Sequence, residues 1–292
     1  MNYDGILYRP PSESASLLLQ VTVGCSHNKC VFCEMYRDKS FRIKPWHEIE
    51  EDITEATRFR LRRVFLCDGD ALIAPQDDLV QVLEAIQERM PWVERVGTYA
   101  DARSILRKTP EELETLHNLG LGIIYHGIES GDDEILKRFR KGSTAAQAVD
   151  AARRVIEAGI TYSGMVLLGL GEIERSREHA IATAEVLNLI QPHYVGVLST
   201  MATEGGTLDA MTQAGEFTLP GRTAMTRELR VLLEHLKLEN CLLTSSHASN
   251  HLAIRVVLPQ DKPKTLAYID KTLKALEAGG DDAFRPDFLR GL

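Results

Sequence analysis

Three of the chain's five cysteines lie within nine residues of one another, in a stretch that runs from Gly24 to Cys33. Cys25, Cys30 and Cys33 follow the apolar run Leu17–Val23, so we expect them on a loop that leaves a buried strand. Thiolates at such short spacing suit an iron–sulfur cluster or a zinc ion, because both prefer soft sulfur ligands. A four-iron cluster bound by only three cysteines keeps one iron open to a further ligand, and chemistry would take place at that iron.

The composition is that of an ordinary globular protein. With 292 residues, of which 26% are charged and 44% hydrophobic, the chain fits one α/β domain with an elaboration. Its formal net charge of −8 argues against a dedicated nucleic-acid binder, because no overall positive field attracts phosphate.

The start of the chain, Met1–Gly5, has neither the basic flank nor the apolar stretch of a signal peptide, and no apolar run is long enough to cross a bilayer. We therefore expect a cytoplasmic protein without a membrane partner. In a reducing compartment, closely spaced cysteines indicate metal binding rather than disulfide bonds.

Short apolar runs alternate with amphipathic segments along most of the chain. The runs predict strands at Leu17–Val23, Arg63–Leu66, Glu94–Thr98, Gly122–His126, Thr161–Leu168, Tyr194–Ser199 and Cys241–Thr244. Apolar residues at helical spacing predict helices at Trp46–Phe59, Asp77–Arg89, Pro110–Leu119, Ala145–Ala158, Arg175–Ile190 and Ala224–Leu238. Such alternation implies a parallel sheet, either a barrel or a doubly wound sheet. The Gly/Thr-rich segment Thr203–Gly221 is the expected hinge to a C-terminal extension.

In both architectures, functional residues gather at the carboxyl ends of the strands. The first predicted strand leads into the cysteines. The next four lead into segments that carry glycines or ionisable side chains, namely Cys67–Ala71, Tyr99–Arg103, His126–Gly131 and Gly169–Glu172. This convergence predicts one functional site along that edge of the sheet.

From about Leu17 to Ser199, these ordered motifs resemble the radical S-adenosylmethionine (SAM) superfamily. Asp68-Gly69-Asp70 stands where that family has a short acidic-glycine motif after its second strand, and Gly169 and Gly171 match the glycines after the fifth. Four residues separate Cys25 from Cys30 where the family usually has three, so the loop departs in shape from the usual one.

Two further segments resemble particular branches of the superfamily. Gly127–Lys137, followed by Lys141–Thr144, is similar to a segment shared by oxygen-independent coproporphyrinogen oxidases, methylthiotransferases and the Elongator catalytic subunit. Glu204–Thr207 resembles the Gly-Thr element after the sixth strand. The resemblance implies an α/β fold: a partial (β/α)6 TIM-like barrel over residues 1–202, with a small α/β extension over 203–292 that covers the substrate pocket.

The resemblance also implies two cofactors. Cys25, Cys30 and Cys33 would bind a 4Fe–4S cluster, and the methionine part of SAM would occupy the fourth iron. Reductive cleavage of SAM would then release a 5′-deoxyadenosyl radical, which abstracts hydrogen from a substrate. By the same resemblance, seven residues are expected to contact SAM: Phe32 near the adenine, Asp68, Gly69 and Asp70 around the methionine group, Arg103 and Glu129 at the methionine and ribose, and Gly169 at the fifth strand end.

Each of these assignments has a structural alternative. The cysteines would also suit a structural zinc site with His27 as fourth ligand, in a non-catalytic module. An Asp-Gly-Asp sequence is a common turn, Glu129 would be an ordinary helix-start carboxylate, and a structural ion pair would explain Arg103. The remaining cysteines, Cys67 and Cys241, are expected to be buried small hydrophobes.

The last predicted strand runs into Ser245–His251, a dense set of hydrogen-bonding side chains. We expect His247 and Asn250 to line the substrate pocket, with His247 as acid, base or hydrogen-bond donor, because histidine titrates near neutral pH. The alternative is that these side chains cap a turn.

Four basic residues follow the cysteine loop, namely Arg37, Lys39, Arg42 and Lys44. They would suit an anionic substrate or an acidic electron donor such as flavodoxin or ferredoxin, or they are solvated surface. Because no second domain for RNA or cobalamin is evident, we expect a small-molecule substrate, with tRNA or a protein as the alternative. The net reaction stays open between oxidation, decarboxylation and rearrangement.

Overall fold

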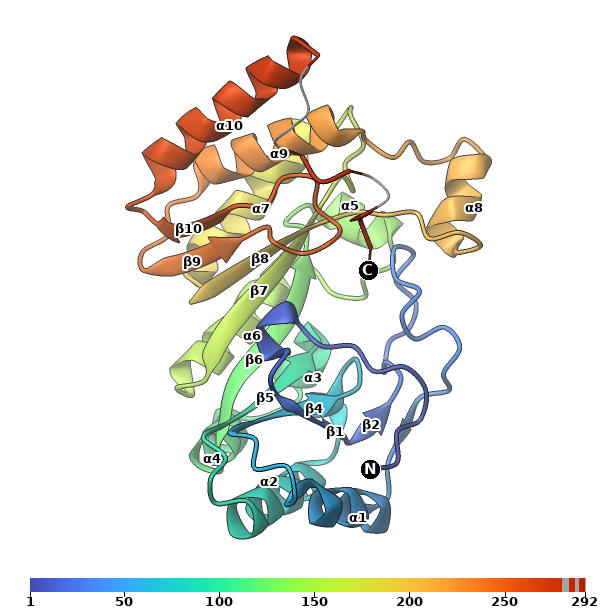
Figure 1. Cartoon of the computed structure of the whole chain (residues 1–292), viewed down its shortest axis with the longest axis vertical. Helices are drawn as coiled ribbons and strands as arrows, with labels where there is room; N and C mark the ends of the chain where they lie inside the picture. Colours follow the sequence, from blue (N-terminus) through green and yellow to red (C-terminus); the bar gives the residue numbers. More distant parts are fainter. Residues whose placement is uncertain (280–283, 287–288, 292) are drawn as a thin grey trace. The chain divides into compact units, whose positions relative to one another are not determined.

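The computed structural model describes residues 1–279, 284–286 and 289–291 (Figure 1). The chain forms two compact units that exchange segments. The first unit comprises residues 1–28, 35–126 and 150–162, and the second comprises 29–34, 127–149 and 163–292. Strands and helices alternate along most of the chain.

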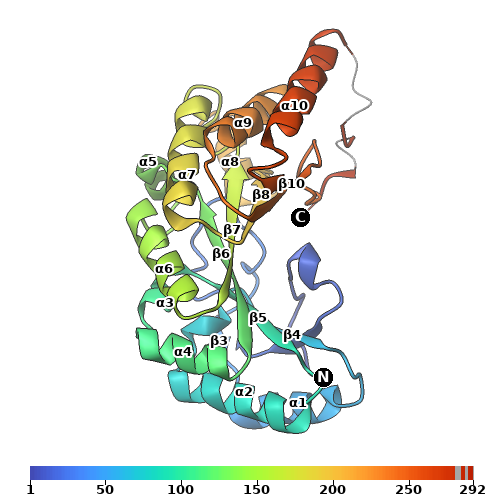
Figure 2. The same ribbon diagram turned by 90° about the vertical axis from the view of Figure 1, so that its left-hand side faces the viewer.

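In the first unit, four parallel strands pair in the order β1 (Leu17–Gln20), β4 (Arg63–Cys67), β5 (Arg95–Ala100) and β6 (Leu121–Glu129). Two short strands, β2 (Thr22–Val23) and β3 (Arg42–Ile43), form an antiparallel pair beside the cysteine loop. The helices of this unit are α1 (Trp46–Ala56), α2 (Gln76–Arg89), α3 (Ala102–Leu106) and α4 (Pro110–Asn118), and α2 lies between α1 and α4 (Figure 2).

In the second unit, β7 (Thr161–Leu168), β8 (Tyr194–Ser199) and β9 (Cys241–Thr244) are parallel, and β10 (Arg255–Leu258) is antiparallel to β9. Its helices are α5 (Asp133–Arg138), α7 (Ser176–Ile190), α8 (Thr207–Gln213), α9 (Arg222–His235) and α10 (Lys262–Glu277), and α6 (Ala145–Glu157) runs from this unit into the first. Helix α9 lies between α7 and α10 (Figure 1).

Local sequence explains where several elements begin and end. Thr109 caps α4 in a capping box with Glu112, and Pro110 occupies the first helical position. Gly159 follows α6 with φ of +82°, a left-handed conformation that favours glycine. Leu79, Leu83 and Ile86 form the buried face of α2, as their spacing predicts.

All seven predicted strands and all six predicted helices are present, with ends shifted by a few residues. The run Leu17–Val23 is divided into β1 and β2. The expected hinge, Thr203–Gly221, contains α8, and two of its side chains, Leu208 and Phe217, are buried. Among the described residues, no helix is both long and apolar enough to cross a bilayer.

Candidate metal and cofactor site

The three cysteines of the loop are half-buried. Cys25 lies in the first unit just after β2, whereas Cys30 and Cys33 lie in segment 29–34 of the second unit. The N–H of Cys33 donates to the carbonyl of Cys30 at 3.2 Å, which closes a tight turn. In the described part of the chain, no three His, Cys, Asp or Glu side chains are already arranged around a metal position. Ligation by these thiols therefore stays a prediction.

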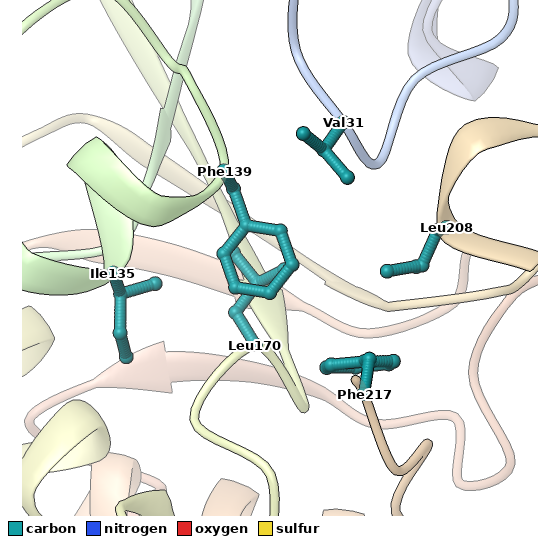
Figure 3. Close-up of a cluster of buried hydrophobic side chains, with 6 residues drawn as sticks. All are labelled: Val31, Ile135, Phe139, Leu170, Leu208 and Phe217. Atoms are coloured by element: carbon teal, nitrogen blue, oxygen red, sulfur yellow. The ribbon is translucent and has the colours of Figure 1, made fainter. Parts of the chain in front are cut away.

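The second half of the loop is anchored by Val31 (Figure 3). Its side chain is buried in an apolar cluster of the second unit, and its N–H donates to the carbonyl of Phe139 at 3.0 Å. The other members of the cluster are Ile135, Phe139, Leu170, Leu208 and Phe217. Phe32 packs against the edge of this cluster, with its ring 6.4 Å from that of Phe139.

A second contact holds the end of the loop. The carboxylate of Glu34 accepts a hydrogen bond from the N–H of Thr207 at 2.9 Å, and Gly206 packs on the Glu34 side chain. Neither Val31 nor Glu34 was predicted as part of the site. Val31 could have been noticed in the sequence, because it is an apolar residue between Cys30 and Cys33, two of the predicted ligands.

Asp68 fixes the start of the loop. Its Oδ2 accepts hydrogen bonds from the N–H of Gly24 at 3.0 Å and from Lys39 Nζ at 2.7 Å. The side chains of Lys39 and Asp68 are only 4% and 0% exposed. Burial raises the pKa of Asp68, and the Lys39 ammonium opposes that rise. Asp68 was expected to contact SAM. In the structure, its Oδ2 instead binds Gly24 and Lys39 and so stabilises the start of the loop. Its buried Oδ1 has no hydrogen-bond partner among the described residues.

Gly69 packs directly against the cysteine loop. A Cβ atom at this position would lie 2.6 Å from Cε2 of Tyr36 and 3.0 Å from Cβ of Cys25. The N–H of Gly69 also donates to the carbonyl of Gly24 at 3.1 Å. The glycine was expected to make room for SAM. In the structure, Tyr36 and Cys25 take the space that a side chain would need.

Asp70 is buried at the centre of a polar cluster in the first unit. Its Oδ2 accepts from Ser26 Oγ at 2.6 Å, and its Oδ1 accepts from Ser104 Oγ at 2.6 Å and from the N–H of Asp101 at 3.3 Å. Burial raises the pKa of Asp70 to about 6, against the opposing effect of the two serine hydrogen bonds. Arg103 lies in the same cluster, and its Nε donates to Asp101 Oδ1 at 2.9 Å. The structure thus brings together Asp70 and Arg103 through Asp101, which caps α3.

In the second unit, Glu129 ends β6 in a left-handed conformation with φ of +66°. Its carboxylate accepts from Lys141 Nζ at 3.1 Å. A Cβ at Gly127 would lie 2.1 Å from Oε1 of Glu129, so the carboxylate folds back over that glycine. The helix-start alternative for Glu129 does not hold, because α5 begins at Asp133 with Asp132 as its cap.

Gly131 and Gly127 should respond differently to alanine. A Cβ at Gly131 would lie 2.1 Å from the carbonyl oxygen of Ala182 in α7, and backbone there has no room to move. We expect Gly131→Ala to lower the free energy of unfolding by about 3 kcal/mol or more, at the upper end of overpacking effects. Gly127→Ala meets only the ends of two flexible side chains, Glu129 and Lys141, so we expect a loss of about 1 kcal/mol or less. Urea denaturation of both variants tests this, and equal losses would contradict it.

Gly169 follows β7 with φ of +90°. Its N–H donates to Glu228 Oε1 at 3.0 Å, and a Cβ there would lie 2.9 Å from Cε of Met225. Both partners are in α9, outside the motifs that the sequence pointed to. Glu228 was missed, although its sequence carries a signal: it is an acidic residue on the face of α9 that also carries Met225, Leu229 and Leu232.

Asn250 and His247, which were predicted to line the substrate pocket, make hydrogen bonds within and around the turn that follows β9. Asn250 is 2% exposed, and its Nδ2 donates to the carbonyls of Val197 and Ser245 while its Oδ1 accepts from Ser199 Oγ. All its polar atoms are thus engaged, which matches the capping alternative. His247 is half-buried, with Nδ1 next to Ser249 Oγ at 2.9 Å. Burial, together with the charge of Arg285, lowers the pKa of His247. A contact between His247 and substrate stays a prediction.

The basic residues after the loop do not form an exposed patch. Lys39 is buried against Asp68, and Lys44 is buried against Asp52 with 2.8 Å between Nζ and Oδ2. Arg42 pairs with Glu48, and Arg37 donates to the carbonyl of Asn28. The two lysines are therefore not the solvated surface that was the alternative, and contact of this region with an anionic partner stays a prediction.

Comparisons with known proteins agree with the motifs. Residues 19–184, more than half of the chain, match the family model of the radical SAM superfamily. A protein from Methanocaldococcus jannaschii that carries the name methylthiotransferase is 23% identical over 164 residues, which cover 53% of this chain and 36% of the relative. The chain thus spans about a third of that relative's length.

Two solved structures share the fold. Methylornithine synthase has a TM-score of 0.55 at 17% identity, over 78% of this chain and 63% of that one. Coproporphyrinogen III oxidase from Escherichia coli has a TM-score of 0.55 at 12% identity, over 75% of this chain and 51% of that one. At such identities the likeness shows the fold alone, and it confirms the predicted fold class, an α/β partial barrel.

Proposed function

Because this chain belongs to the radical SAM superfamily, whose enzymes use a 4Fe–4S cluster and SAM, we propose that it cleaves SAM reductively and abstracts hydrogen from a small-molecule substrate. Cys25, Cys30 and Cys33 are the proposed cluster ligands. The observation that carries the proposal is the packing of Gly69 on Cys25, because it joins the strand-end motif Asp68–Asp70 to the thiol loop.

The residues present fit both cofactors. Three half-buried thiols form the soft donor set that an iron–sulfur cluster requires. Buried carboxylates at Asp68 and Asp70 suit the ammonium group of SAM, because a buried cation needs an acidic partner. When bound, the reduced cluster supplies the electron that cleaves the sulfonium of SAM and yields the 5′-deoxyadenosyl radical.

The protein's own side chains would bind SAM and orient it next to the cysteine loop. Asp70 accepts hydrogen bonds from two serines and would accept another from the SAM ammonium. Lys141 holds the carboxylate of Glu129, and Asp101 holds the guanidinium of Arg103, so both proposed SAM contacts are oriented by a neighbour of opposite charge. Burial of Val31 and the hydrogen bond of Glu34 hold the second half of the cysteine loop.

We propose a small-molecule substrate over tRNA or a protein. The burial of Lys39 and Lys44 supports this choice, because it leaves the region after the cysteine loop with less exposed positive charge for a nucleic acid. An electron donor such as flavodoxin or ferredoxin completes the proposal. His247 is the proposed substrate-facing residue of the C-terminal extension.

The test is anaerobic. The protein is reconstituted with iron and sulfide, mixed with SAM and a strong reductant, and assayed for 5′-deoxyadenosine by mass spectrometry. We expect product from the wild type and none from Cys30→Ala, which should also retain less iron, because a cluster ligand is lost. Iron and sulfide analysis accompanies each assay.

Cys241→Ala is the matched control, because this cysteine is buried in β9 and is not part of the cysteine loop. It should retain both iron and activity. A wild type that binds zinc, takes up no iron and forms no 5′-deoxyadenosine would overturn the proposal and favour the structural zinc site.

A further inference from the structure

A buried carboxylate from the C-terminal extension reaches the end of β7. Glu228, in α9, is 2% exposed, and both of its oxygens accept hydrogen bonds. Oε1 lies 3.0 Å from the N–H of Gly169 and 3.0 Å from Nδ1 of His179. Oε2 accepts from Ser176 Oγ at 2.8 Å. The side chain therefore ties together α9, the start of α7 and the strand end at Gly169.

Gly169 is held from more than one side. The methyl group of Met225, also in α9, fills the space next to its Cα, which leaves no room for a Cβ. On the strand side, the carbonyl of Leu168 accepts hydrogen bonds from both the N–H and the Oγ1 of Thr200. The carbonyl of Gly169 accepts a hydrogen bond from the N–H of Glu172 at 3.2 Å, and its N–H donates to Glu228.

A small cavity of about 10 Å³ lies beside this network. Its lining includes the polar residues His179, Glu228, Thr183 and Glu129. His179 is 2% exposed, and its Nε2 has no hydrogen-bond partner among the described residues. The other residues that line the cavity are apolar, so the cavity borders the hydrogen-bond network of Glu228 without extending it.

We propose that Glu228 is a positioning residue that sets the backbone of the Gly169 turn for SAM. This inference rests on the proposed function, because it takes Gly169 as a SAM contact. Glu228 lies beyond residues 19–184 that match the superfamily model, so the C-terminal extension contributes directly to the cofactor site of the barrel. Burial of an acidic group is unfavourable unless it is hydrogen-bonded, and here both carboxylate oxygens have partners, of which Gly169 belongs to the proposed SAM site.

Two variants, Glu228→Ala and Glu228→Gln, distinguish the effect of the hydrogen bond to Gly169 from the effect of the negative charge of Glu228. Glutamine retains an oxygen at the same distance along the side chain, so it still accepts from Gly169, whereas alanine does not. We expect Glu228→Ala to weaken SAM binding by about tenfold or more, the effect of losing a hydrogen bond to a charged group. Glu228→Gln should stay within about threefold of the wild type. Equilibrium dialysis with reconstituted protein measures both.

Amide hydrogen exchange of the peptide around Gly169, measured without SAM, gives a second readout. Glu228→Ala should speed exchange there and Glu228→Gln should not. Leu233→Ala is the matched control, because Leu233 is buried in the same helix about 7 Å farther along its axis. It should destabilise the fold but leave SAM affinity unchanged.

The outcomes distinguish the two claims. Unchanged exchange in Glu228→Ala, or a loss of affinity equal to that of Leu233→Ala, would overturn the positioning inference. If the wild type carries its cluster but does not bind SAM, while exchange still responds to Glu228→Ala, the proposed function fails and the inference about SAM fails with it.

Discussion

Replacing Lys39 with methionine is expected to lower the free energy of unfolding by about 3–5 kcal/mol, because it leaves the carboxylate of Asp68 buried without its ion-pair partner. Methionine fills a similar volume, so the effect reports mainly the charge. The variant should also retain less iron, since the same carboxylate binds the N–H of Gly24 at the start of the cysteine loop.

Two further variants test the cause. Adding Asp68→Asn to Lys39→Met removes the unpaired charge and should restore part of the lost stability. Lys271→Met, at an exposed position of α10, should change stability by about 0.5 kcal/mol or less. The deficit of Lys39→Met should also shrink at acidic pH, where protonation neutralises Asp68. Urea denaturation across pH measures all three, and a Lys39→Met protein as stable as Lys271→Met would rule out a structural role for the pair.

Regular periodicity made most of the fold predictable. Thr161–Leu168, Tyr194–Ser199 and Cys241–Thr244 are strands with the predicted ends. The helices α3, α5 and α8 have seven residues or fewer, too few turns to show a period, and were missed. Helix α10 was also missed, although Ile269 and Leu273 stand on its buried face at readable spacing.

The types of residue in the candidate site could be predicted, but the side chains with which they pair could not. Placement at strand ends drew attention to Asp70 and Glu129, which the structure places in hydrogen-bonded clusters, whereas their predicted contact with SAM stays a prediction. The sequence carried no sign that Lys39 would pair with Asp68, 29 residues away, or that Glu228 would reach Gly169, 59 residues away. Such pairings depend on tertiary packing of segments far apart in the sequence, which local patterns do not encode.

Asp70 should make stability depend on pH in a direction unusual for a carboxylate. Its pKa is about 6 in the folded protein, against an ordinary value of 3.8. Between these values the folded state retains a proton that the unfolded state has released, so the contribution of this group to stability falls as pH rises through that window. The full change, from the two pKa values, is roughly 3 kcal/mol.

Asp70→Asn removes this dependence, because asparagine has the same shape and does not ionise. Relative to the wild type, the variant should gain stability by up to roughly 3 kcal/mol between pH 4 and pH 7. Urea denaturation at pH 4.5, 5.5, 6.5 and 7.5 follows the difference. Asp77→Asn, at an exposed position of α2, is the control for a change of surface charge. A difference between Asp70→Asn and the wild type that stays constant with pH would contradict the expectation.

The carboxylate of Asp70 is buried and weakens the fold at neutral pH. We propose that its function is to bind SAM. The ionised form of Asp70 would pair with the SAM ammonium, so SAM affinity of the wild type should fall as pH drops below about 6, the pKa of Asp70. In Asp70→Asn, the affinity should be about tenfold lower at pH 7.5 and should vary less with pH, since no charge is left to titrate. Equilibrium dialysis at the same four pH values measures this. An Asp70→Asn protein that binds SAM as tightly as the wild type at pH 7.5 would remove Asp70 from the SAM site and leave it as a brace between Ser26 and Ser104.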